Sequence, residues 1–344
     1  MRKYVLPLLC CLLVNLCGAQ IKYGISADDV VFQKSYPQRK ELKRHGGIAT
    51  FDLTVKNEKG EPIQGANGGA CFWYRNGSTS TRGISDENGK LILSNKAKTD
   101  GSYIIEKEGF YKTRGGVSSF DAPDEPFGFF ERRRWVPVVR DVILKEKRNP
   151  IPMYSKRFKG KIPLFNQAIG FDLKVVDWVR PYGKGEVVDM YITIEAKDEV
   201  FRKETFKRPY AIVFEWPRKY DGVQVCDADF WSEFISAYSV DLEKPFQKKL
   251  VLTPPKSDSG GSWLPGSKYL TFRVRSERSP TGELIQCHYG KIYTSIYAHW
   301  STLYIAPIFF NPTPNDTKLE FDPENNLSPF SCLSEEDKLN TLCP

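Results

Sequence analysis

The sequence predicts an all-β protein with two sandwich-like domains and one short helix. Short runs that alternate between apolar and polar residues recur along the chain, and turns that contain Gly or Asn separate them, a pattern typical of β-sandwiches. Hydrophobic residues make up 40% and aromatic residues 13% of the sequence, which argues against intrinsic disorder. With 344 residues, the chain is long enough for about two domains.

The N-terminus has the features of a secretory signal peptide, which we place at residues 1–19. Arg2 and Lys3 precede an apolar run over residues 4–16, and small residues follow before Gln20. This pattern predicts cleavage between Ala19 and Gln20. The run is shorter than the about 20 residues of a membrane-spanning helix, and no comparable run occurs later in the chain. We therefore expect a mature protein without a transmembrane segment that is secreted, periplasmic or located at the cell surface.

The cysteines leave several alternatives open. Lipid attachment at Cys17 is the alternative to cleavage after Ala19, although Leu16 is a poor match to the small residue that a lipoprotein signal has at that position. Cleavage would leave an odd set of cysteines, at positions 71, 226, 287, 332 and 343, so at least one is unpaired or paired between chains. Cys332 and Cys343 can form a disulfide only if the chain folds back, because one helix would separate them by about 16 Å. Buried free thiols at most of these positions are the other interpretation.

The first half of the chain is predicted to hold a leader and a β-sandwich. Residues 20–47 mix charges with few apolar positions, which indicates a leader segment that is mobile or wrapped onto a domain. From residue 48 to residue 147 the alternation of a sheet dominates. The predicted strands are residues 51–55, 70–74, 81–84, 91–93, 102–105 and 138–144. Residues 115–135 are predicted to be an insertion rich in Pro, Gly and Phe, which ends in Arg132, Arg133 and Arg134.

Three pieces of this first domain occur in an order that resembles carboxypeptidase-regulatory-like domains. They are residues 55–66 (VKNEKGEPIQGA), 85–91 (SDENGKL) and 107–111 (KEGFY). The resemblance implies a seven-stranded sandwich of the transthyretin-like or Ig-like type. It also implies an accessory module of exported proteins that carries no catalytic residues of its own. Cys71 and the Phe-rich insertion depart from the usual pattern of these domains.

A second β-rich domain is predicted over residues 148–323. Two prolines in residues 147–152 (KRNPIP) favour an extended junction before it. The predicted strands are residues 171–179, 187–195, 210–216, 249–252, 269–277, 284–296 and 303–310. Aromatic residues at helical spacing predict one helix over residues 229–238. A C-terminal tail over residues 324–344 is expected to contain a short helix that begins at Ser334.

This second half is similar to the C-terminal region of an uncharacterised family of secreted bacterial two-domain proteins. The similarity rests on residues 177–185 (DWVRPYGKG), 288–293 (HYGKIY), 311–316 (NPTPND) and 319–323 (LEFDP). That family has no assigned activity, so the similarity implies an architecture and no reaction.

No catalytic signature emerges from the residues. Glu320 and Asp322 are two positions apart, so on a strand both would point to one face and could act as paired carboxylates in glycoside hydrolysis. The simpler interpretation is a polar loop edge. His288 and His299 are separated by an odd number of positions, which places them on opposite faces of a regular strand. No nucleophile motif, phosphate-binding loop or zinc-ligand spacing occurs, and we expect neither a metal nor a cofactor.

Exposed aromatic rings are the candidate ligand-binding groups. Trp73, Trp231 and Trp263 lie near predicted turns or the predicted helix, where a ring can stack on a sugar, although core packing is the commoner fate of tryptophan. The basic runs at residues 132–134 and 156–161 could attract acidic glycans or lipid headgroups. No motif for nucleic-acid binding accompanies them.

The sequence therefore predicts an exported, non-catalytic binding or structural module of the cell envelope or periplasm. Its expected partner is a polysaccharide or an envelope protein. Two alternatives stay open at this point: a carbohydrate-active hydrolase that uses Glu320 and Asp322, and a surface protein that is lipid-anchored at Cys17.

Overall fold

The structure is a computed structural model that describes residues 37–74, 76–123, 133–201, 204–255 and 262–329. The predicted signal peptide, the cleavage site Ala19–Gln20, Cys17, Cys332, Cys343 and the helix from Ser334 lie outside these residues. The chain divides into two compact units. The first contains the described residues up to Arg148 together with Trp231–Phe234, and the second contains the remaining described residues from Asn149 on.

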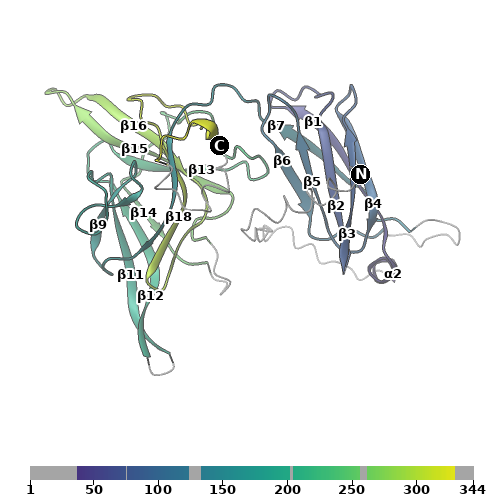
Figure 1. The fold of residues 1–344 in the computed structure, drawn as a ribbon, viewed down its shortest axis with the longest axis horizontal. Coiled ribbons are helices and arrows are strands. Elements are labelled where there is room, and N and C mark those ends of the chain that lie inside the picture. The colour runs from purple at the N-terminus through teal and green to yellow at the C-terminus, as the bar shows by residue number, and fades with distance from the viewer. Residues whose placement is uncertain (1–36, 75, 124–132, 202–203, 256–261, 330–344) are drawn as a thin grey trace, which may run out of the picture. The chain divides into compact units, whose positions relative to one another are not determined.

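The first unit is a sandwich of seven strands, as the sequence predicts, and Figure 1 shows them in purple to blue. One sheet has the strand order β4-β1-β7, with β1 and β7 parallel, and the other has the order β3-β2-β5-β6. The strands are β1 (Gly47–Asn57), β2 (Asn67–Tyr74), β3 (Gly77–Ile84), β4 (Lys90–Ala97), β5 (Gly101–Glu106), β6 (Thr113–Val117) and β7 (Val138–Leu144).

Alternation along β1 explains how this sandwich closes. Phe51, Leu53 and Val55 are fully buried, whereas the residues between them are only partly buried. The Phe51 ring packs 5.4 Å from the ring of Phe72 in the opposite sheet. Full burial of a side chain of this size contributes about 2–3 kcal/mol to folding. The period of two in the sequence thus becomes the contact between the two sheets.

The segment before β1 contributes a helix to the first unit. Helix α2 (Pro37–His45) lies within the predicted leader, and its Leu42 is fully buried in the core of the sandwich. Gly47 is the first residue of β1, and a Cβ at this position would come within 2.3 Å of the Leu42 side chain. The described end of the leader is therefore packed onto the domain.

Strand β6 corrects the prediction of an insertion that begins at residue 115. Gly115 and Gly116 suggested a loop, but they are needed for close packing. A Cβ at Gly115 would meet the Tyr103 ring at 2.2 Å, and one at Gly116 would meet the Gly101 carbonyl at 2.5 Å. Glycine in a strand often marks such a close approach of neighbouring groups.

The second unit is a sandwich of a five-stranded and a six-stranded sheet, shown in teal to yellow in Figure 1. The first sheet has the order β10-β9-β11-β12-β14; the second has the order β13-β15-β16-β18-β17, with β8 paired to β18. Its strands are β8 (Tyr154–Lys161), β9 (Ala168–Asp172), β10 (Asp177–Trp178), β11 (Met190–Phe201), β12 (Glu204–Glu215), β13 (Gly222–Asp227), β14 (Lys249–Leu252), β15 (Lys268–Arg278), β16 (Leu284–Ile292), β17 (Ile296–His299) and β18 (Thr302–Phe310).

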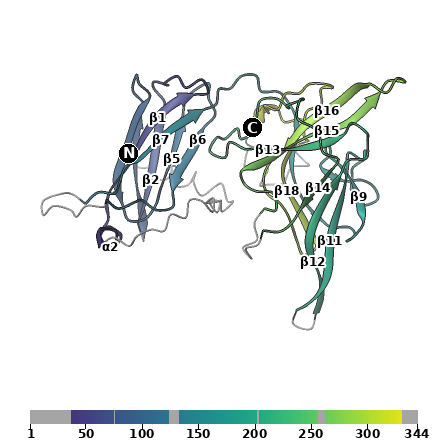
Figure 2. The same ribbon diagram turned by 180° about the vertical axis from the view of Figure 1, so that it is seen from behind.

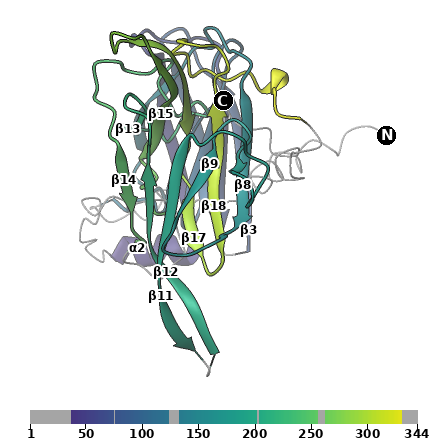
Figure 3. The same ribbon diagram turned by 90° about the vertical axis from the view of Figure 1, so that its left-hand side faces the viewer.

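Both sheets of the second unit contribute to one apolar core. It joins Ile192 and Phe214 of one sheet to Phe272, Val274 and Ile305 of the other. Two hairpins extend beyond this core. Strands β11 and β12 form a long arm at one end (Figures 1 and 3), and β15 and β16 extend at the opposite end (Figure 2). A short 3₁₀ helix, η2 (Pro323–Asn325), follows the last strand.

The helix predicted at residues 229–238 is wrong. Ser232, Phe234 and Ser236 are buried, whereas the residues between them are more exposed, which is the period of an extended chain. Within the first unit, the Arg114 amide donates to the Trp231 carbonyl at 2.8 Å, and the Glu233 amide donates to the Lys112 carbonyl at 2.8 Å. These ladder contacts with β6 replace the i, i−4 bonds of a helix, so tertiary pairing overrides the local pattern.

Among the described residues, no helix is long and apolar enough to cross a membrane.

Candidate functional site

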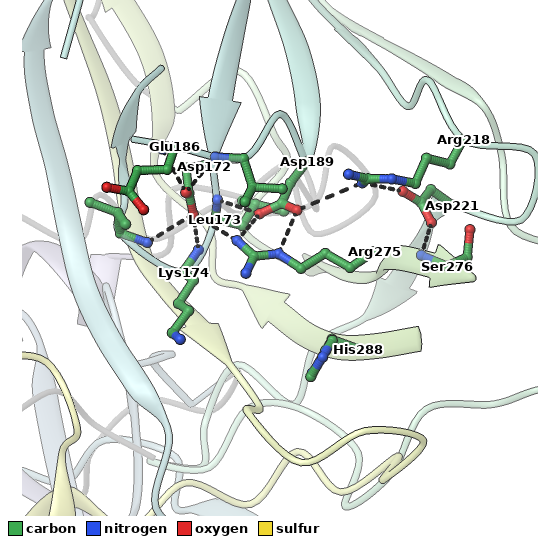
Figure 4. A network of polar contacts seen from close by, with 12 residues as sticks. Asp172, Leu173, Lys174, Glu186, Asp189, Arg218, Asp221, Arg275, Ser276 and His288 are labelled. Atoms are coloured by element: carbon green, nitrogen blue, oxygen red, sulfur yellow. Dashed lines mark hydrogen bonds and ion pairs between the residues drawn. The ribbon is translucent and has the colours of Figure 1, made fainter. Parts of the chain in front are cut away.

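A buried cluster of charges joins the two sheets of the second unit. Arg275 lies in a β-bulge of β15, between residues paired with β16, and has a positive φ of 55°. The bulge turns its side chain toward the core, where it meets Asp172 at the end of β9 and Asp189 just before β11. Figure 4 shows the guanidinium group between these two carboxylates.

Both carboxylates of this cluster accept hydrogen bonds from donors of the chain. Arg275 Nε donates to Asp189 Oδ1 at 2.9 Å, and Arg275 Nη2 donates to Asp189 Oδ2 and to Asp172 Oδ1, both at 2.9 Å. Asp172 and Asp189 are buried, with 1% and 0% of their surface exposed. Backbone amides fill the remaining positions on the carboxylates: those of Lys174, Val175, Glu186 and Val187 on Asp172, and that of Leu173 on Asp189.

The cluster continues into the loop between β12 and β13. Arg218 Nη1 lies 3.2 Å from Asp221 Oδ2 and 4.0 Å from Asp189 Oδ1, and the Ser276 amide donates to Asp221 Oδ1 at 2.9 Å. The arrangement is an alternating row of positive and negative groups (Figure 4). Because the chain's own donors occupy these carboxylates, the cluster acts as a clamp between the sheets. Among the described residues, no group of three or more His, Cys, Asp and Glu side chains is placed to hold a metal ion.

His288 of β16 lies beside this clamp. Its Nδ1 is 3.2 Å from the Asn311 carbonyl, and its ring stacks on Phe310, whose ring also contacts the Arg275 guanidinium. Burial lowers the pKa of His288 below 6.5; the nearby charges of Arg275 and Lys174 act in the same direction, while the hydrogen bond to Asn311 and the charge of Glu277 oppose it. The folded protein therefore favours the neutral imidazole.

This direction predicts a loss of stability in mild acid. Below pH 6.5 the unfolded chain binds a proton at this histidine more readily than the folded chain. The contribution of neutral His288 to the free energy of unfolding is therefore present at neutral pH and falls as the pH decreases. We expect His288→Gln to show a smaller drop in urea midpoint between about pH 7.5 and about pH 5 than the wild type. The matched change His299→Gln, at an exposed position, should keep the wild-type drop. An equal drop in all three proteins would contradict the prediction.

The structure places Glu320 and Asp322 in structural roles. Glu320 is 3% exposed, and its carboxylate accepts the Asn149 amide at 2.7 Å. Asp322 is the N-cap of η2, where its side chain accepts the Glu324 amide at 3.0 Å and the Asn325 side-chain amide at 2.7 Å. Both carboxylates thus bind groups of the chain itself.

The three tryptophans chosen from the sequence differ in exposure. Trp263 is 9% exposed and belongs to the core of the second unit, so its ring offers no stacking surface, and its selection as a ligand-binding residue is wrong. Trp73, at the end of β2, is half-buried. Trp231 is 38% exposed. The predicted turn near Trp263 did not reveal that the Trp263 amide donates to the Ile296 carbonyl of β17.

A different tryptophan, Trp300, is the most exposed large aromatic residue in the described chain, with 54% of its surface accessible. It lies in the two-residue turn between β17 and β18, closed by the pair His299 and Thr302. Its φ of 52° is in the left-handed region, which turns normally fill with Gly, Asn or Asp. A bulky residue in this conformation is costly and points to a role for the side chain.

Aromatic side chains continue from Trp300 across the surface of the second unit. Phe206 of β12 stacks on Trp300 with ring centroids 5.1 Å apart. The centroid of the His299 ring lies 5.8 Å from that of Trp300. Tyr297 and Tyr304 stack across β17 and β18 at 4.6 Å. Because residues two apart on a strand share a face, His299 connects the two pairs. We call this set the aromatic strip: Phe206, Tyr297, His299, Trp300 and Tyr304.

The strip was missed from the sequence although four of its five members lie within residues 297–304. The alternation of Tyr297 with His299 before Trp300, and of Thr302 with Tyr304 after it, is visible in the sequence as a hairpin signal. Phe206 lies 94 positions before Trp300 in the sequence, and only the fold brings it to this surface.

The three cysteines of the described chain form no disulfide with one another. Cys71 and Cys287 are buried, and Cys226 is partly buried. Burial raises the pKa of the Cys287 thiol, which disfavours the reactive thiolate.

No protein-family model matches this chain, and no curated protein sequence matches it. Several solved structures share a limited likeness of fold. One is 3-chlorocatechol 1,2-dioxygenase from Rhodococcus opacus, with 12% identity over 30% of this chain and a TM-score of 0.25. The match covers 61% of that enzyme, so this chain corresponds to less than two thirds of its length.

Two further matches span more of the chain. The full-length major pilin SpaD from Corynebacterium diphtheriae is 12% identical over 80% of this chain and 84% of its own, with a TM-score of 0.20. A candidate carbohydrate-binding protein from Bacteroides uniformis is 10% identical over 76% of this chain and 97% of its own, with a TM-score of 0.17. At these values the likenesses carry no functional argument, and function has to be argued from the surface itself.

Proposed function

We propose that this protein is an exported, non-catalytic glycan-binding module of the cell envelope or periplasm, and that the aromatic strip is its ligand-binding surface. The observation that supports the proposal is Trp300, an exposed ring held in a backbone conformation that disfavours it. Apolar ring faces next to polar groups suit a sugar, which presents C–H groups on one face and hydroxyl groups at its edge.

The first unit fits an accessory role in this proposal. Its seven strands, together with the three sequence pieces at residues 55–66, 85–91 and 107–111, support assignment to the carboxypeptidase-regulatory-like domains. In such an arrangement the first unit serves as a structural module and the second unit binds the ligand.

Affinity electrophoresis tests the proposal. We expect the purified protein to be retarded by at least one polysaccharide of a panel of plant, algal and bacterial cell-wall glycans. Absence of retardation in every gel would contradict glycan binding and favour a protein partner.

A turnover assay addresses the hydrolase alternative. Since Glu320 and Asp322 bind groups of the chain, we expect no release of reducing ends from any retained glycan, and no difference between wild type and the double variant Glu320→Gln, Asp322→Asn. Turnover that disappears in the double variant would establish the hydrolase instead.

A further inference from the structure

Two lysines border the aromatic strip on the same face of the sheet. Strand β8 pairs with β18, so that Lys159 lies opposite Tyr304 and Lys161 lies opposite Thr302. On the other side of β18, Tyr304 lies opposite Tyr297 and Thr302 opposite His299. Directly opposed residues of antiparallel strands have neighbouring side chains on one face. The lysines therefore share a face with Tyr297, His299 and Tyr304 of the strip, next to the turn that holds Trp300.

Both ammonium groups are available to an incoming anion. Lys159 and Lys161 are exposed. Lys159 Nζ lies 5.4 Å from the centre of the Tyr304 ring, a cation–π contact that leaves its charge uncompensated. Among the described residues, neither lysine has a carboxylate partner within ion-pair distance.

Two acidic groups beside Phe206 on the arm form ion pairs with lysines. On the arm next to Phe206, Glu199 lies 3.1 Å from Lys197 Nζ, and Asp198 lies 2.8 Å from Lys207 Nζ. These pairs reduce the negative field on that side. The strip thus combines two exposed rings, Trp300 and His299, and three half-buried ones with a positive edge. Such an edge attracts a negatively charged ligand.

We propose that the ligand is an acidic polysaccharide, a polyuronide whose sugar rings stack on Trp300 and its neighbours while its carboxylates contact Lys159 and Lys161. This inference rests on the proposed function and specifies the class of glycan. Rings alone suit neutral sugars and lysines alone suit any anion; their presence in adjoining rows selects a sugar that carries a charge. A single-stranded nucleic acid also combines flat rings with charge. Proteins that bind it use a positively charged groove along the phosphate backbone, and two lysines along one edge supply fewer cationic groups than such a groove.

The test compares each acidic polymer with a neutral polymer of the same backbone. Affinity electrophoresis of the purified protein would use polygalacturonate, alginate and hyaluronan, each beside the form in which its carboxylates have been reduced to alcohols. We expect at least one polyuronide to retard the protein and its reduced form to bind about tenfold more weakly, since two exposed charge contacts are lost. The retardation should also weaken as the salt concentration rises.

Charge-matched variants locate the site. Lys159→Gln with Lys161→Gln should weaken binding of the polyuronide by about tenfold and leave any binding of the reduced form unchanged. The control is Lys184→Gln with Lys219→Gln, which lowers the net charge equally. Both control lysines are exposed, and Lys219 lies over Tyr220 at 5.3 Å, much as Lys159 lies over Tyr304. The control should bind like the wild type.

The outcomes separate the two proposals. Equal binding of acidic and reduced polymers, or equal effects of the two double variants, would overturn the inference while the glycan-binding function stands. The inference would also be overturned, and the glycan-binding function kept, if none of the six polymers bound but a neutral glycan from another source retarded the protein through Trp300. Binding to none of them and to no other glycan would overturn both. Tighter binding of single-stranded DNA than of any polyuronide, with the same dependence on Trp300, would replace the glycan by a nucleic acid.

Discussion

Arg275→Met is expected to lower the free energy of unfolding of the second unit by about 3–5 kcal/mol, the usual result of removing one partner from a buried charge cluster. Asp172 and Asp189 would lose their guanidinium group while both stay buried. Methionine keeps an unbranched chain over the Phe310 ring, so the change removes the charge with little loss of packing. Amide hydrogen exchange in β9 and β15 reports this unit by itself.

Two further variants separate the charge from other effects. Burial raises the pKa of Asp189, while Arg275 opposes that shift, so the carboxylate left without its guanidinium is the costly group. Asp189→Asn in the Arg275→Met protein should therefore recover part of the lost stability. The matched surface change is Arg180→Met, because Arg180 forms an exposed pair with Glu186 at 3.6 Å; its effect should stay within about 0.5 kcal/mol. Equal effects of Arg275→Met and Arg180→Met on the free energy of unfolding would contradict a stabilising role of the Arg275 cluster between the two sheets.

The second large effect concerns binding. Trp300→Ala is expected to weaken the affinity for the retained glycan by about 30-fold or more, which corresponds to the about 2 kcal/mol of a central aromatic contact. Phe206→Ala should weaken it less, because Phe206 supports the Trp300 ring and is itself half-buried. Isothermal titration calorimetry with oligosaccharides of that glycan measures both.

Controls for this prediction use the turn itself. Trp300→Gly suits the positive φ of this position, so its stability should match the wild type within about 1 kcal/mol even though the affinity is lost. Trp231→Ala removes the other well-exposed tryptophan and should leave the affinity unchanged. If Trp231→Ala abolished binding and Trp300→Ala did not, the ligand surface would lie at the position chosen from the sequence.

The strand content of this protein follows from the sequence. Alternation of apolar and polar residues, as in Phe51 to Val55 and in Leu270 to Val274, places one face in a core whatever the partner strand is. Turns such as residues 86–89 end these runs locally. For this reason the all-β class could be predicted without knowledge of any long-range contact. The alternation predicted six strands in the first domain, and the resemblance to carboxypeptidase-regulatory-like domains implied the seven that the structure has.

Only the tertiary structure showed that residues 229–238 are extended rather than helical. It alone also revealed the cluster around Arg275 and the aromatic strip. The chain at Ser232 is extended because β6 offers backbone partners, which no local pattern contains. Arg275 meets Asp172 across 103 positions, and Phe206 meets Trp300 from another sheet. In each case the deciding interaction joins residues far apart in the sequence, and the exposure of a ring depends on what the fold places over it. The seven tryptophans thus look alike in the sequence, while packing buries Trp263 and leaves Trp300 on the surface.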